Sequence, residues 1–153
     1  MSEKQNSQRR IHRIETELAH HQTHLKSLEQ AETLDQQALA IRQNQLGKHH
    51  PDTTSNLNNL GMLYELQGHY GEAETLLQEA LTIREQQLQL GADHTDTANS
   101  LNNLAMLYTK QGRYEEAKLF LSRALQIYEQ CLGKNHPDTI NVCKGLDLLR
   151  ELS

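Results

Sequence analysis

Apolar residues recur at helical spacing in two stretches of the chain that repeat each other. Residues 56–83 read NLNNLGMLYELQGHYGEAETLLQEALTI, and residues 100–127 read SLNNLAMLYTKQGRYEEAKLFLSRALQI, 44 positions later and without a gap. In each copy, leucines and a tyrosine form one face of a first helix, which a glycine, Gly68 or Gly112, then ends. Alanines and large apolar residues predict a second helix after the glycine. The pattern therefore predicts stacked helix pairs and no strand.

A short polar linker joins successive units. The sequence LGKHHPDT at 46–53 returns as LGKNHPDT at 132–139, and LGADHTDT at 90–97 is a third version. The proline in two of the three linkers suits the first turn of a helix, where a backbone N–H is not needed. The aspartate near the end of each linker favours the positive end of a helix dipole. We therefore expect the first helix of each pair to begin within a linker.

The repeat extends beyond the two full units at both ends. Residues 31–47 match the second helix at 73–88, so residues 9–26 are predicted to form an eroded first helix before it. Residues 138–152 are predicted to form a final helix of the first type, which has no second helix after it and serves as a polar cap. The domain prediction is one domain over 1–153, with a degenerate repeat at 9–49, full repeats at 50–93 and 94–136, and a C-terminal capping helix at 137–153.

The N-terminal helix also has a second interpretation. Its apolar positions are spaced alternately by three and four residues, as in the seam of a coiled coil. This seam is short, with fewer than three heptads, and one of its positions is a histidine. The seam positions are Ile11, Ile14, Leu18, His21, Leu25 and Leu28. The segment is thus either a degenerate repeat helix or a coiled-coil segment.

The repeat resembles the tetratricopeptide repeat (TPR) in its signature positions. These are Leu57, Leu60, Gly61, Tyr64, Gly68, Tyr70, Ala73, Leu77 and Ala80 in one unit, and their counterparts from Leu101 to Ala124 in the next. The sequence LNNLAMLYTKQGRYEEA and the linker LGKNHPDT resemble those of the long-repeat subclass found in kinesin light chains. The resemblance implies an all-α fold, a right-handed superhelical α-solenoid of antiparallel helix pairs. It also implies a concave face built mainly from first helices.

The resemblance further implies a peptide-binding site on that concave face. Similar light-chain repeats hold the backbone of an extended peptide with an asparagine at the positions of Asn58 and Asn102, since a carboxamide both donates and accepts. The alternative, that such asparagines join neighbouring helices, stays open. The peptide-binding residues carried over are Asn58, Asn59, Met62, Glu65, Leu66, Asn99, Asn102, Asn103, Met106, Lys110 and Lys144, with Ser55, Thr109, Asn141 and Leu148 on the same face.

Other residue clusters do not indicate catalysis or a bound cofactor. His20 and His24 lie one helical turn apart near Glu17, but no further metal ligand is indicated, so we predict no metal site. Cys143 occupies the signature position of Leu57 and is predicted to be a core thiol. No phosphate loop, nucleophile motif or paired carboxylate is present. We therefore predict that the chain is not an enzyme and needs no cofactor.

Composition narrows the possible partners. The net charge of −5 and the pI of about 6.0 disfavour nucleic acid, which favours a basic face. No apolar run approaches the roughly 20 residues of a membrane span. Two cysteines and no export signal predict a cytoplasmic protein.

The function predicted is a protein–protein interaction adaptor that binds a partner peptide or helix in its groove. The alternative is a self-associating structural scaffold, a homo-oligomer.

Overall fold

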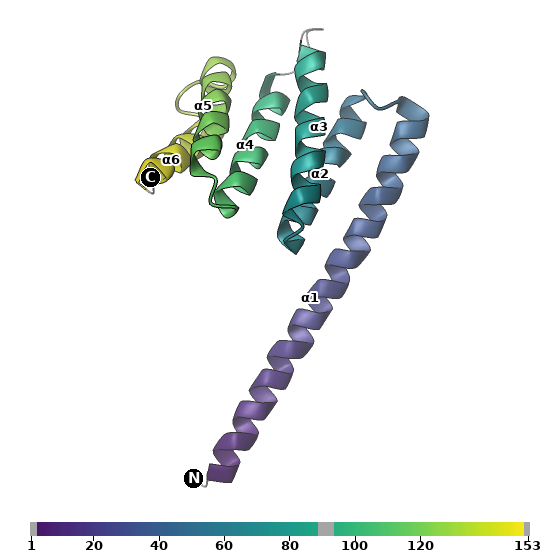
Figure 1. Cartoon of the computed structure of the whole chain (residues 1–153), viewed down its shortest axis with the longest axis vertical. Helices are drawn as coiled ribbons and strands as arrows, with labels where there is room; N and C mark the ends of the chain where they lie inside the picture. The colour runs from purple at the N-terminus through teal and green to yellow at the C-terminus, as the bar shows by residue number, and fades with distance from the viewer. Residues whose placement is uncertain (1–2, 89–93, 152–153) are drawn as a thin grey trace. The chain divides into compact units, whose positions relative to one another are not determined.

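Six helices make up the part of the chain that the structure describes. The structure is a computed structural model, and it describes residues 3–88 and 94–151. Within these ranges there is no strand, so the all-α prediction is confirmed. The linker at 90–97 lies partly outside the described residues. The helices are α1 (Glu3–Leu46), α2 (Pro51–Gln67), α3 (Tyr70–Leu88), α4 (His94–Lys110), α5 (Tyr114–Cys131) and α6 (Pro137–Glu151) (Figure 1).

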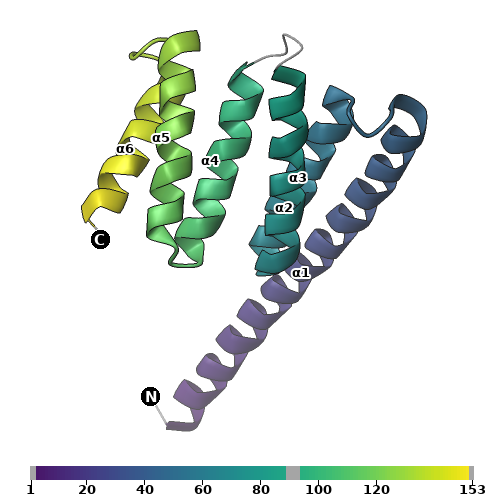
Figure 2. The same ribbon diagram turned by 45° about the horizontal axis from the view of Figure 1, so that its top comes forward.

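The chain divides into two units. The first unit is Met1–Leu34, and its described residues all belong to α1. The second unit is Asp35–Ser153, which holds the end of α1 and the helices from α2 to α6. In this second unit, α2 packs on α3 and α4 on α5 as successive antiparallel pairs, and α6 packs on α5 (Figure 2). The predicted stack of helix pairs is therefore present.

Glycine ends the first helix of each pair, as the sequence predicts. Gly68 has φ 82° and Gly112 has φ 75°, a left-handed conformation that costs a residue without a Cβ little. The amide of Gly68 donates to the carbonyl of Glu65 at 3.1 Å, and the amide of Gly112 does the same to Thr109 at 3.0 Å. These turns reverse the chain direction within each pair.

The linker histidines cap the helices that follow them. The amide of Asp52 donates to Nδ1 of His50 at 3.2 Å at the start of α2. The amide of Asp138 donates to Nδ1 of His136 at 3.3 Å at the start of α6. Each bond satisfies a backbone N–H that the helix itself leaves without an acceptor. The repeated His-Pro-Asp sequence therefore sets where two of the helices begin.

An arginine joins α1 to α2, and another joins α3 to α4. Arg84 of α3 donates to the carbonyl of Asp96 at 2.9 Å and to the hydroxyl of Ser100 at 2.6 Å. Burial lowers the pKa of the Arg84 guanidinium, since a low-dielectric environment disfavours its charge. Arg42 of α1 stands 42 positions earlier and donates to the side chain of Asn56 in α2. The same contact thus repeats along the stack.

The N-terminal segment differs from one prediction. We expected residues 9–26 and 31–47 to be separate helices, but α1 is continuous from Glu3 to Leu46. In the repeat register, Lys26 stands at the position of Gly68. Lysine does not favour the left-handed conformation that ends the other first helices, and it favours a helix interior. The prediction of a helical hairpin in this segment is therefore wrong.

The prediction for Cys143 is also wrong. Its side chain is exposed, although Leu57 and Leu101 at the corresponding positions are buried. In α2 and α4 this position faces the second helix of the same pair, and α6 has no such partner among the described residues. Val142, one position earlier, is buried instead. Asp147 is exposed, as expected of a polar cap.

Candidate functional site

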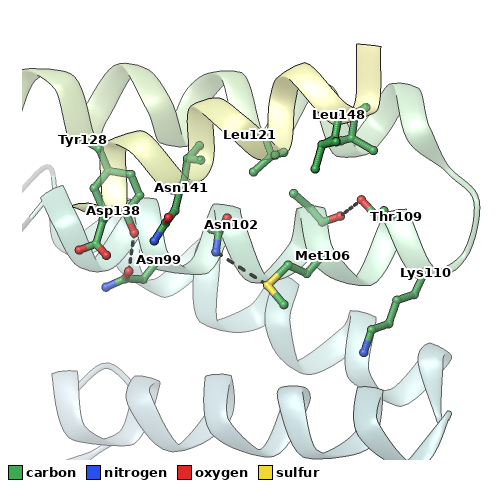
Figure 3. Close-up of a pocket in the computed structure, with 14 residues that line it drawn as sticks. Asn99, Asn102, Met106, Thr109, Lys110, Leu121, Tyr128, Asp138, Asn141 and Leu148 are labelled. Atoms are coloured by element: carbon green, nitrogen blue, oxygen red, sulfur yellow. Dashed lines mark hydrogen bonds between the residues drawn. The ribbon is translucent and has the colours of Figure 1, made fainter. Parts of the chain in front are cut away.

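A hollow of about 600 Å³ lies where α4, α5 and α6 meet. Figure 3 shows side chains from all three helices directed toward it. Its volume is within the range typical of ligand pockets and could hold one or two large side chains of a partner. The lining residues are Asn99, Asn102, Ala105, Met106, Thr109, Lys110, Leu121, Tyr128, Asp138, Asn141, Val142, Gly145, Leu148 and Leu149.

The hollow is apolar in the middle and charged at its two ends. Met106, Leu121 and Leu148 lie between Asp138 at one end and Lys110 at the other (Figure 3). Leu148 is 61% exposed, and such exposure leaves a large apolar side chain for a partner to cover. The arrangement suits a segment that inserts an apolar side chain and keeps polar groups at the rim.

The absence of a side chain at Gly145 helps to open the hollow. Asn103 occupies the corresponding position in α4, where its amide donates to the sulfur of Met62 at 3.3 Å across the preceding junction. Gly145 has no side chain at the corresponding point, and a Cβ built on it would meet Leu121 Cδ1 at 3.6 Å, an ordinary van der Waals distance, so the site accepts a Cβ without strain. The junction between α2 and α4 is therefore filled at a point where the junction between α4 and α6 is open.

Tyr128 and Val142 change the same junction in a second way. Tyr128 stands at the position of Arg84, and Val142 stands at the position of Ser100, so the arginine bond of the earlier junctions is absent here. The Tyr128 hydroxyl donates to the Asn99 side chain instead. Burial, together with the negative charge of Asp138, raises the pKa of Tyr128 to about 12. The phenol therefore stays neutral at ordinary pH and orients the amide of Asn99 at the rim.

Lys110 at the other end of the hollow is paired with a buried carboxylate. Its Nζ lies 2.5 Å from Oε1 of Glu65, whose side chain is 5% exposed. A carboxylate is costly to bury without a cation, so the pair holds Lys110 toward α2. Much of the charge that Lys110 offers a ligand is thus already balanced. Asp138 at the opposite end lies 3.5 Å from His136 Nδ1, at the solvent-exposed start of α6.

The structure brings together part of the predicted concave face. Four of the eleven predicted peptide-binding residues line the hollow, together with three others from the same face. They are Asn99, Asn102, Met106 and Lys110, with Thr109, Asn141 and Leu148. Asn102 directs its amide toward the sulfur of Met106 at 3.9 Å. These residues belong to α4 and α6, so the candidate site is the last junction of the stack.

The other predicted residues lie elsewhere. Asn58 is only 7% exposed, and its carbonyl oxygen accepts from the Ser100 hydroxyl at 3.5 Å. Its side chain therefore joins α2 to α4, as the alternative interpretation of these asparagines holds. Met62 and Asn103 fill the same junction. The remaining residues do not line the hollow: Asn59, Leu66 and Lys144 are exposed, and Glu65 is buried against Lys110.

Several lining residues were not among the residues predicted from the sequence. Tyr128, Leu121 and Asp138 belong to the second helix or to the linker, whereas the prediction considered first helices only. Val142, Gly145 and Leu149 were treated as parts of a capping helix. A signal was available, because Tyr128 and Gly145 differ from the residues at the corresponding positions of the preceding repeat.

Within residues 3–88 and 94–151, no three His, Cys, Asp or Glu side chains cluster as metal ligands would. Cys131 and Cys143 are both free and exposed. None of the helices in the described ranges has the length and apolar character needed to cross a membrane.

The sequence matches models of the tetratricopeptide repeat family over most of its length. One model matches residues 10–86, and a second matches residues 97–138. The chain therefore belongs to the tetratricopeptide repeat family. Repeats of this family generally mediate protein–protein interactions. No curated protein matches the chain significantly.

Solved structures with similar folds are kinesin-light-chain-like repeat proteins. One is a Podosopora anserina protein described as a kinesin light chain of nearly identical TPR-like repeats, with a TM-score of 0.72 and 24% identity over 90% of this chain. This chain covers 64% of that protein. Another is BtubC (BKLC) from P. vanneervenii, with a TM-score of 0.71 and 27% identity over 82% of this chain and 48% of that one. The likeness confirms the right-handed α-solenoid and the kinesin-light-chain-like subclass.

Proposed function

We propose that this chain is an adaptor that binds a segment of a partner protein in the hollow between α4, α5 and α6. The observation that carries the proposal is that Met106 and Leu148 are exposed apolar side chains in a concave site of about 600 Å³. Burying apolar area is the main source of affinity in most protein associations. The proposal involves no catalysis, and it places the adaptor in the cytoplasm.

The charges at the rim indicate which partner segments fit. Lys110 is balanced by the buried Glu65 at 2.5 Å, whereas the exposed Asp138 lies 3.5 Å from the half-exposed His136. A Lys or Arg of the partner would therefore gain more at the Asp138 end than a carboxylate would gain at the Lys110 end. The expected ligand is a segment with one large apolar side chain and a basic residue near it.

Asparagine side chains at the rim supply the orientation. Asn102 and Asn141 each carry a donor and an acceptor, and both line the hollow. A bound backbone could exchange a pair of hydrogen bonds with such a carboxamide, which would fix the register of the segment. Asn58 is not part of this proposal, because its side chain is buried at the preceding junction.

The test selects ligands from a display library of random peptides with the whole chain as bait. Peptides that survive selection are synthesised, and their dissociation constants are measured by fluorescence anisotropy. The test variant is Leu148→Glu, and the matched control is Leu119→Glu. Leu148 and Leu119 are 61% and 62% exposed on helices, but only Leu148 lines the hollow. Both variants should therefore fold, which circular dichroism would verify.

The expected result is a loss of about tenfold or more in affinity for Leu148→Glu and no change for Leu119→Glu, since a central apolar contact carries at least about 1.4 kcal/mol. Asp138→Asn should weaken binding of peptides that contain Lys or Arg. Equal binding by all variants would place the ligand elsewhere and overturn the proposal. So would a selection that yields no peptide.

A further inference from the structure

The first half of α1 exposes a row of large apolar side chains. Ile14, Leu18 and Leu25 are 60%, 55% and 58% exposed, although α1 is a regular helix through all of these positions. The described residues of the first unit form this one helix, so the unit has no second element of its own to pack against. Helices in water gain most of their stability from packing an apolar face. We therefore expect this row of apolar side chains to pack against another protein segment.

The spacing of this row fits a coiled coil better than it fits the repeat. With Ile11 as position a of a heptad, positions a and d hold apolar residues everywhere except at His21. The repeat register instead places Glu15 at the position of the buried Leu57. It also places Leu25 at the position of the polar Gln67, although Leu18 and Leu28 fall at the positions of Leu60 and Tyr70 and so agree with both patterns. The continuity of α1 agrees with the coiled-coil interpretation, because a heptad seam needs an unbroken helix.

We propose that two copies of this chain associate through residues 10–29 as a parallel two-stranded coiled coil. The flanking charges select this partner. In a parallel pair, position g of one helix faces position e of the next heptad in the other helix. Arg10 at g would face the second copy's Glu15, and His24 at g would face its Glu29. Each contact occurs twice by symmetry, and none of them sets like charges together.

An antiparallel pair over the same seam lacks this complementarity. It would place position e against e and position g against g. Glu15 would then face the second copy's Glu29, and Glu17 would face Glu17. Like charges at such positions weaken association. The charge pattern therefore favours the parallel arrangement, and this inference does not depend on a ligand in the hollow between α4, α5 and α6.

Sedimentation equilibrium of the whole chain, from about 1 to 200 µM, tests whether the seam associates. The expected mass at the upper end is about twice the chain mass of 17.5 kDa. The double variant Leu18→Glu with Leu25→Glu should remain a monomer. The matched control, Thr16→Glu with Thr23→Glu, adds the same charge on the opposite face of the helix at two exposed positions and should still dimerise.

Charge reversal tests the proposed register. Arg10→Glu should weaken dimerisation by roughly tenfold, and Arg10→Glu combined with Glu15→Arg should restore it. A disulfide between two copies of Ile14→Cys, made in a Cys131→Ser and Cys143→Ser background, should form only in the parallel pair. A monomeric wild type at 200 µM, or a seam variant that dimerises like the control, would overturn the proposal. Restoration that fails, or cysteines that do not cross-link, would refute the parallel register.

Discussion

Gly145 offers the sharpest test of how the hollow arises. If the missing side chain leaves real space, Gly145→Ala should fit without strain. The added Cβ would lie 3.6 Å from Leu121 Cδ1, which is an ordinary van der Waals contact. Replacing glycine by alanine inside a helix contributes about 0.5–1 kcal/mol, because glycine loses more backbone entropy on folding. We therefore expect Gly145→Ala to stabilise α6 by about 0.5–1 kcal/mol.

Gly61→Ala provides the matched comparison in α2. There the added Cβ would lie 2.8 Å from Leu77 Cγ and 3.0 Å from Leu77 Cδ2, and Leu77 is fully buried. Overpacking of this kind costs about 1–3 kcal/mol, which exceeds the gain in helix propensity. The same substitution should thus destabilise the protein at position 61 by about 1 kcal/mol while it stabilises position 145.

The assay combines urea denaturation with amide hydrogen exchange. Exchange is needed because α6 is the last helix of the stack and can open locally before the rest unfolds. Amides of α6 should exchange about two- to fivefold more slowly in Gly145→Ala, as expected for a stabilisation of 0.5–1 kcal/mol. Faster exchange in α6 would show that the added methyl group of Gly145→Ala is sterically crowded and destabilises the helix. The proposed origin of the hollow would then be wrong.

Three further predictions concern the polar contacts of the stack. Lys110→Met should destabilise the protein by about 1 kcal/mol, because it leaves the buried Glu65 carboxylate without its cation, and thermal denaturation should show most of this loss reversed by adding Glu65→Gln. Arg84→Met should cost about 2 kcal/mol in urea denaturation, since it removes a buried bond to Ser100, and a value near zero would refute the role of the arginine as a link between pairs. Tyr128 has a pKa of about 12 when folded and about 10 when unfolded, so it contributes stability that is complete below pH 10 and is lost as pH rises toward 12. Denaturation between pH 9 and 12 should therefore show a shallower decline in Tyr128→Phe than in the wild type.

The sequence was sufficient to predict most of the fold. Glycines at 68 and 112 predicted where first helices end, and the linker motif predicted where α2 and α6 begin. These features are local, so their physical effect does not depend on distant parts of the chain. The predicted break in α1 is absent because the local signal that would produce it is missing. The segment keeps a weak repeat pattern but has lost the glycine that would end the helix.

The candidate site was harder to predict, because it depends on which side chains meet across a junction. Asn58 and Asn102 are equivalent in the repeat, yet Asn58 is buried against Ser100 whereas Asn102 lines the hollow. The difference comes from the next pair in the stack. Ser100 gives Asn58 a hydroxyl to accept from, and Val142 at the corresponding position offers Asn102 none. A residue-by-residue transfer of the family site cannot detect this, since it treats each repeat alone.

The departures of the repeat from its own pattern locate the site better than its regular positions do. A unit that repeats faithfully fills each junction in the same way, with an arginine bond and an asparagine side chain between neighbouring pairs. At the last junction Tyr128, Val142 and Gly145 replace these groups together, and each replacement removes a polar contact or volume that the earlier junction has. The buried residues through which α6 packs on the stack are Thr139, Val142, Leu146 and Leu149. The binding proposal and the Gly145→Ala prediction therefore depend on the same geometry, because both require that the packing of α6 leaves space at this junction.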